Sequence, residues 1–265
     1  MSPSIFRKMF SDHWKSLLAW GAVIVFMVSI QMYVYPSVAS SGDAAQQLLD
    51  TFPESIRKIF RIEDYASGPG FLSVELFSMM IPLVMIGVGL TWGANATAEE
   101  EEDGTADILY ALPLSRTSIL MSKVLAILTA LLLLSVAAFI QIVALRGFAS
   151  LTVDTVNLAI ACFMQFLLGV FFSAIGFLCG ALTGKKSLSL GIGAGFAILA
   201  FLFYSLAPMV DTFEFTNPIN PFQWTVGENA LIEGINFLSA AKLALSSVAV
   251  YLMAIFTFSK REMRS

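Results

Sequence analysis

The chain has 265 residues, of which 57% are hydrophobic and only 13% are charged, and its formal net charge is −4. A soluble domain carries roughly 45–50% apolar and about 25% charged residues, so this composition excludes an ordinary soluble enzyme and indicates contact with lipid. The acidic balance, together with the lack of a basic patch of useful size, excludes a nucleic-acid partner.

Long apolar runs occur at six places along the chain, and the first of them ends at Tyr35-Pro36 and is too long for a cleavable signal peptide. A membrane-spanning helix needs ~20 predominantly apolar residues, whereas a barrel strand needs only ~10 alternating ones. The sequence therefore predicts an all-α membrane protein with a single transmembrane domain over residues 1–265. Its six spans are expected at about 17–35, 74–92, 119–145, 158–182, 188–209 and 237–258.

The orientation follows from Lys and Arg, which accumulate on the cytoplasmic side of membrane proteins. With the N-terminus inside, ten of these residues fall on the inner side, namely Arg7, Lys8, Lys15, Arg116, Lys123, Lys185, Lys186, Lys260, Arg261 and Arg264. The outer side holds Arg57, Lys58, Arg61, Arg146 and Lys242. We therefore expect both termini to lie inside, although the cluster 57–61 is unusual for an outer loop.

The longest outer loop, 37–73, contains a second regular pattern. Apolar residues recur there at helical spacing, with charged residues between them, and they are Leu48, Leu49, Phe52, Ile56, Ile59 and Phe60. The pattern predicts an amphipathic helix that lies on the outer surface between spans one and two. It is either a packed connector or an external gate over a transport path.

Small residues and cysteines in the later spans are interpreted as packing residues. Small-xxx-small spacing lets helices approach closely in lipid, and the residues concerned are Gly169, Ser173, Gly176, Gly180, Gly184, Gly191, Gly193 and Gly195. Cys162 and Cys179 lie ~25 Å apart along one helix, which is beyond disulfide reach. The more polar segment 211–236 is expected to be a structured outer loop, with Phe222 and Trp224 as anchors at the membrane interface.

The sequence contains no recognisable nucleotide-binding, metal-binding or catalytic motif. Gly184-Lys185-Lys186-Ser187 departs from a phosphate-binding loop at two positions, so no ATP site is expected and both lysines are interpreted as topology-setting charges. The one histidine, His13, is expected at the surface and forms no metal or catalytic set. Glu75 and Lys242 fall near outer span ends, so no ion-coupling carboxylate is expected inside the spans.

The inner loop between spans two and three carries the most informative pattern. An acidic run, Glu99–Asp103, precedes Gly104 and Thr105, and Thr105 can cap a short helix that Pro113 stops. Ser115 can then cap the helix of span three. The loop is therefore either a docking element with a short amphipathic helix or an ordinary solvated linker.

At this loop the sequence resembles the permease subunits of ABC-2-type transporters. The motif of that family reads here as Glu100, Glu102, Gly104, Thr105, Leu109, Leu112, Pro113, Ser115 and Arg116, with Lys123 after it. The resemblance extends to the order of six spans, the long first outer loop and the Asn-Pro-Phe segment before span six. The acidic run Glu99–Asp103 is denser than is usual in the family.

The resemblance implies a dimer with a second permease copy or paralogue in the inner membrane of a prokaryote. It implies that loop 99–116 acts as a coupling helix on a separate cytoplasmic P-loop ATPase, which binds ATP and Mg²⁺, while this chain is not an enzyme and holds no cofactor. Most relatives are exporters, so export is expected. The alternative is a membrane scaffold or immunity-type subunit that binds a partner and transports nothing.

Overall fold

The computed structural model describes residues 2–41, 65–105 and 113–260, and within them six helices are long and apolar enough to cross a membrane. They are α1 (Pro3–Ser40), the continuous helix Gly68–Glu102, α7 (Arg116–Leu145), α8 (Thr155–Thr183), α9 (Lys186–Leu206) and α12 (Phe237–Lys260). The second of these joins α4 (Gly68–Leu72), the π-helix η1 (Ser73–Met80) and α5 (Ile81–Glu102). The six predicted spans are confirmed. Helix α9 ends at Leu206, three residues before its predicted limit, and the other five helices extend beyond their predicted apolar runs at one or both ends.

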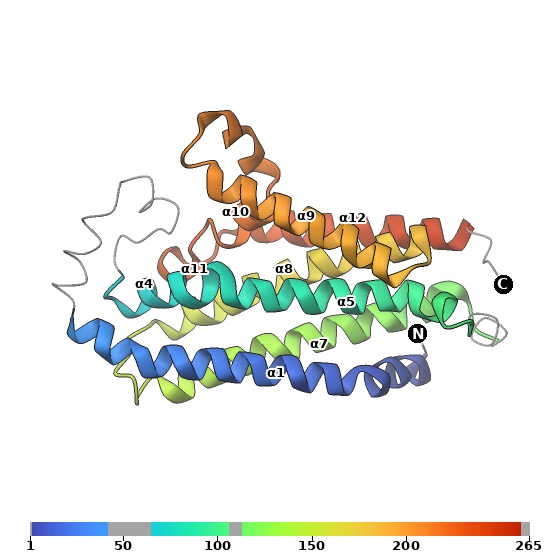
Figure 1. Cartoon of the computed structure of the whole chain (residues 1–265). Helices are drawn as coiled ribbons and strands as arrows, with labels where there is room; N and C mark the ends of the chain where they lie inside the picture. Colours follow the sequence, from blue (N-terminus) through green and yellow to red (C-terminus); the bar gives the residue numbers. More distant parts are fainter. Residues whose placement is uncertain (1, 42–64, 106–112, 261–265) are drawn as a thin grey trace.

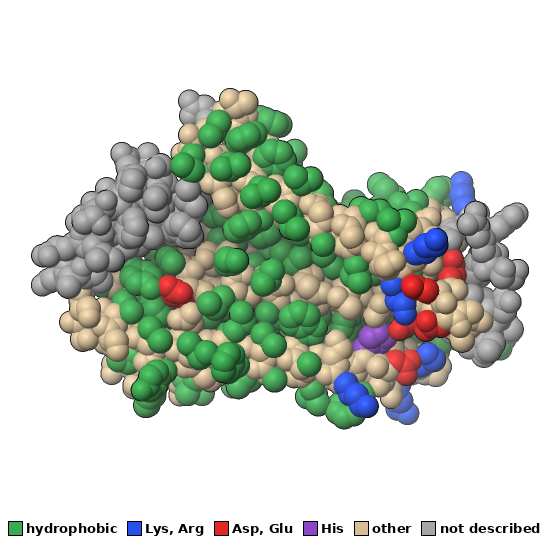
Figure 2. Space-filling view, viewed as in Figure 1, with side chains coloured by type: hydrophobic (Ala, Val, Ile, Leu, Met, Phe, Trp, Pro, Cys, Tyr) green, Lys and Arg blue, Asp and Glu red, His purple; other side chains and the backbone are tan. Residues whose placement is uncertain are grey.

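The six helices run alongside one another, with α8 at the centre (Figure 1). Helix α8 contacts α5 most extensively, then α12, α7 and α9, and it is the most buried of the spans. The start of α1, the end of α5, the start of α7 and the end of α12 lie at one end of the bundle (Figure 1). Charged side chains gather there, so we call it the charged end (Figure 2).

Glycines allow α5 and α8 to approach closely, as the small-residue pattern predicts. A Cβ added at Gly176 would lie 2.6 Å from the backbone oxygen of Leu90, so no larger residue fits without moving a helix. The prediction is wrong for Gly191 and Gly195, because nothing lies within 4 Å of a Cβ at either position. These two glycines face away from the rest of the chain on α9.

The first helix does not end at Tyr35-Pro36 as predicted, but continues to Ser40. A proline inside a helix lacks the N–H that would bond to the carbonyl four residues earlier, and it usually ends or kinks the helix. Here Pro36 stands in the last turns, where only one such bond is lost and the end of the helix is exposed.

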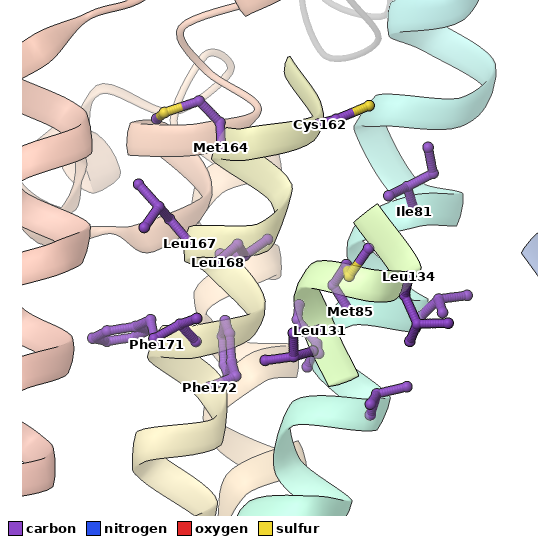
Figure 3. Packing of buried hydrophobic residues seen from close by; sticks show 14 of the residues in the cluster. Ile81, Met85, Leu131, Leu134, Cys162, Met164, Leu167, Leu168, Phe171 and Phe172 are labelled. Carbon is purple, nitrogen blue, oxygen red and sulfur yellow. The ribbon is translucent and has the colours of Figure 1, made fainter. Parts of the chain in front are cut away.

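A continuous apolar core forms where α5, α7 and α8 meet. Figure 3 shows Met85, Leu131 and Leu168 from these three helices within this cluster. Cys162 and Cys179 are both free and buried, which confirms their interpretation as packing residues. Close van der Waals packing of these side chains holds the helices in one arrangement, because lipid is as apolar as they are and burial alone gives no driving force.

The segment 211–236 is structured, as expected, and contains η2 (Asp211–Ile219), α10 (Pro221–Thr225) and α11 (Ala230–Glu233). Its aromatic residues are not interfacial anchors, because Phe222 and Trp224 are only 4% and 9% exposed. Asn220 accepts a hydrogen bond from the backbone of Phe222 and donates one to Ala200 in α9, which turns these aromatic side chains inward. The amphipathic helix predicted between 48 and 60 lies outside the described residues.

Candidate coupling site

The acidic run is the last turn of α5, and a glycine ends that helix. Gly104 has φ +67°, a backbone conformation that favours glycine. Its N–H donates to the carbonyl of Glu101, and the N–H of Thr105 donates to that of Glu100 at 2.8 Å. These two bonds form a Schellman motif, which satisfies the last carbonyls of the helix. The Gly-Thr pair of the motif therefore sets the exit of the chain from α5.

Acidic residues at the C-terminal end of a helix are unfavourable, because that end carries a partial negative charge. Cationic side chains from other helices offset it here. Lys123 of α7 is 4% exposed, and its Nζ lies 2.5 Å from Glu100 Oε1 and donates to the carbonyl of Ala96 at 2.8 Å. The first and last residues of the predicted motif are thus bonded to each other.

His13 extends this cluster to α1, and its expected position at the surface is wrong. Its side chain is only 11% exposed, and its ring lies against Trp92 with centroids 5.3 Å apart. The Nε2 atom lies 2.9 Å from Asn95 Nδ2 and 3.5 Å from Glu99 Oε2. Residues four apart share a face of a helix, so α5 presents Asn95 and Glu99 to the ring together.

Lys186 connects the cluster to the first turn of α9. Its Nζ lies 3.9 Å from Glu99 Oε1 and 3.5 Å from Asp103 Oδ1. Its backbone N–H donates to Glu102 Oε2 at 2.8 Å, so a carboxylate occupies the positive end of α9. This lysine is more than a topology-setting charge, because it joins the start of α9 to the end of α5.

The far end of the loop is the start of α7. Ser115 caps that helix, as predicted, by accepting a hydrogen bond from the N–H of Ser118 at 3.2 Å. Pro113 and Arg116 are exposed on either side of it. Leu109 and Leu112, with the short helix that Thr105 is expected to cap, lie outside the described residues.

Of the described residues of the predicted site, Glu100 and Glu102 join one cluster at the charged end, whereas Gly104 and Thr105 form the end of α5 and Pro113 and Arg116 are exposed near the start of α7. We define the acid cluster as Glu99, Glu100, Glu102 and Asp103 with their partners His13, Lys123 and Lys186. Sequence reasoning missed His13 and Lys186 as members. The acidic run at the C-terminal end of a helix indicates that cationic partners are needed. The sequence does not show which residues these partners are or how far away they lie.

The fold and this cluster define a multi-pass membrane protein whose polar centre lies at one end of an apolar bundle. Comparison with protein families then gives its class: the model described as ABC-2 family transporter protein matches residues 4–263. The chain belongs to this family, and it is the membrane-embedded component of a transporter. No curated protein matches the chain.

Proposed function

We propose that this chain is the permease subunit of an ABC exporter and that a separate cytoplasmic P-loop ATPase docks on loop 99–116. ABC-2 permeases as a family work with such a subunit. In this proposal both termini lie in the cytoplasm, two permease chains form a dimer in the inner membrane of a prokaryote, and ATP and Mg²⁺ bind only to the partner.

The observation that supports the proposal is the set of polar side-chain contacts, two of them made by lysines, that join the loop's base to three other helices. The end of α5 is bonded to α7 through Lys123, to α9 through Lys186 and to α1 through His13. A partner that moves the loop therefore acts on four helices at once. A solvated linker, the alternative interpretation, has no need of a buried lysine at its base.

The proposed orientation, with both termini in the cytoplasm, is supported by the lysines at the charged end. Lys8, Lys123, Lys186 and Lys260 belong to helix segments at the charged end, and cytoplasmic ends of spans are enriched in Lys and Arg. The segment Gly184-Lys185-Lys186-Ser187 approaches a phosphate-binding loop but departs from it at two positions. Power supplied by a separate subunit fits this composition.

The test is purification of the tagged full-length chain in mild detergent, with mass spectrometry of the proteins that co-elute. We expect a stoichiometric P-loop ATPase, and we expect Arg116→Glu to weaken its retention or its coupled ATP hydrolysis. Arg146→Glu is the matched control, because Arg146 follows α7 at the opposite end of the bundle.

The outcomes distinguish a permease subunit from a membrane scaffold. Loss of the ATPase in Arg116→Glu but not in Arg146→Glu supports docking at the loop. A stable oligomer that retains no ATPase would instead support the scaffold or immunity-type subunit. Uptake of substrate into inverted vesicles in the presence of ATP would establish export, and ATP-driven movement in the other direction would overturn it.

A further inference from the structure

A cavity of about 570 Å³ lies at the end of the bundle opposite the charged end. Its walls come from η1, α8, the last turns of α9 and the segment between α10 and α11. Figure 2 shows the molecule hollowed in this region, beside the projecting segment that contains η2 and α10. Small-molecule sites in proteins have volumes of about 300–1,000 Å³, so this cavity has the size of one.

One wall of the cavity is an irregular helix whose hydrogen bonds explain a buried glutamine. In η1 the N–H of Ile81 bonds to the carbonyl of Leu76, one residue further back than in an α-helix. The next N–H would come from Pro82, which has none, so the carbonyl of Phe77 lacks a partner within the helix. Gln165 of α8 supplies it, because its Nε2 donates to that carbonyl at 3.1 Å.

This arrangement leaves the other end of the glutamine unused. Gln165 is 2% exposed, it lines the cavity, and its Oε1 accepts no hydrogen bond from the described residues. Helical segments of the π type are frequently found at functional sites. The fold therefore leaves a buried acceptor without a partner among the described residues beside the cavity.

A second acceptor at the cavity wall is a carboxylate. Glu75 is the one charged side chain among the described residues that line it. Its carboxylate accepts from the hydroxyl of Tyr65 at 2.6 Å and from Gln31 Nε2 at 3.3 Å. Burial and the hydrogen bond to Glu75 raise the pKa of Tyr65, so the phenol keeps its proton and donates it.

Three of the hydroxyl groups around the cavity already donate to groups of the protein. The hydroxyls of Ser73, Ser78 and Thr225 donate to Asn229, to the carbonyl of Val74 and to the carbonyl of Pro221. Most of the other wall residues are apolar, and three of them are methionines, which adapt to ligands of different shape. They include Phe77, Met79, Met80, Met164 and Phe201.

From these contacts we infer that the cavity binds an amphipathic organic cation, with its ammonium group at Glu75 and its apolar body against the methionine and phenylalanine side chains. A carboxylate in the wall of a cavity whose other described residues are uncharged selects a positively charged donor over a neutral molecule or an anion. That such a cation is the transported substrate rests on the proposed function. Binding itself does not, since it needs neither the ATPase nor ATP.

The experiment is equilibrium dialysis of the purified full-length chain in phosphatidylcholine nanodiscs, with empty discs subtracted. The probes are pyrene-1-methylamine, pyrene-1-methanol and pyrene-1-carboxylate, which share one apolar body and differ in charge. We expect the amine to saturate one site per chain and to bind at least about tenfold more tightly than the alcohol. Equal binding of amine and alcohol, or no saturable binding, would overturn the proposal.

Two variants and a control locate the site. Glu75→Gln keeps the shape of the side chain and is expected to weaken amine binding about tenfold while leaving alcohol binding unchanged. Glu233→Gln is the control, because Glu233 is exposed on α11 and does not line the cavity. Unchanged amine binding in Glu75→Gln would overturn the assignment.

A third variant keeps the test decisive if Glu75→Gln alters the fold, which its elution in size-exclusion chromatography would reveal. Ser205→Trp fills the cavity from α9 and leaves Glu75 in place. It is expected to abolish binding of both amine and alcohol, and retained amine binding would contradict the proposal. Because no ATPase is present, a negative result here leaves the proposed permease function to its own test.

Discussion

Lys123 and Glu100 stand on opposite sides of the loop between α5 and α7, and Lys123 Nζ lies 2.5 Å from Glu100 Oε1. The lysine is almost completely buried and also donates to the carbonyl of Ala96. Glu100 belongs to the last turn of α5 and Lys123 to the second turn of α7, so the pair closes the base of the loop. The two ends of the loop are thereby held at a fixed distance from each other.

Replacing this lysine should destabilise the protein strongly. Lys123→Met leaves Glu100 without its cation, and loss of one partner of a buried ion pair costs about 3 kcal/mol. Glu100→Gln added to Lys123→Met should recover part of the loss, because no uncompensated charge remains. Thermal unfolding in detergent measures both. Lys8→Met is the control, since the Lys8–Asp12 pair is exposed and such pairs contribute about 0.5 kcal/mol or less.

Gly104→Ala tests the end of α5 separately from any contact. A Cβ at this position meets nothing within 4 Å, so the only cost is the positive φ, about 1 kcal/mol. We expect slightly lower thermal stability together with reduced coupling of ATP hydrolysis in the complex. Gly147→Ala is also open but lacks a positive φ, and it should change neither. Identical behaviour of the two variants would show that the backbone at Gly104 is unimportant.

The close approach of α5 and α8 can be tested with one methyl group. Gly176→Ala places a Cβ against the backbone of Leu90 and should cost about 1–3 kcal/mol, because the helices must move apart. Gly195→Ala adds the same group where no neighbour exists, and higher helix propensity should leave stability equal or slightly increased. Thermal unfolding of the two variants in the same detergent compares them. If Gly176→Ala lowered thermal stability no more than Gly195→Ala does, the close packing of α5 and α8 would be contradicted.

The orientation of the bundle can be tested by labelling single cysteines. In a chain with Cys162→Ala and Cys179→Ala, a cysteine introduced at Ser259, near the end of α12, should react with a membrane-impermeant maleimide only after cells are opened. A cysteine at Thr212 in η2, at the opposite end, should react in intact cells. The reverse pattern would place both termini outside.

The spans were predictable because their signal is strong and local. Each lipid-crossing helix must contain ~20 predominantly apolar residues, and this requirement is visible in the chain without knowledge of any neighbour. The helix bounds were less predictable: α1 continues past Pro36, and α5 continues through four glutamates, since helical structure does not stop where the membrane does. The caps at Ser115 and Gly104 follow from local backbone chemistry.

Contacts between distant segments were not predictable in the same way. The motif names Glu100 and Lys123 but does not pair them, and nothing in the sequence places His13 beside Glu99. The cavity was missed for the same reason, because Glu75 and Gln165 are 90 residues apart and meet only after α8 packs against η1. Phe222 and Trp224 match the composition of an interfacial anchor, yet the capped turn at Asn220 directs them inward.

One helix from Gly68 to Glu102 carries Glu75 near its first end and Glu100 near its last. At 1.5 Å per residue these two carboxylates are roughly 38 Å apart along one helix. An axial displacement of this helix that is transmitted through η1 and Pro82 moves both ends together, without a relay of side chains between them. Since linkage between two binding equilibria is reciprocal, a molecule that displaces the helix from the cavity changes the affinity at the loop, and a partner at the loop changes the affinity of the cavity by the same factor.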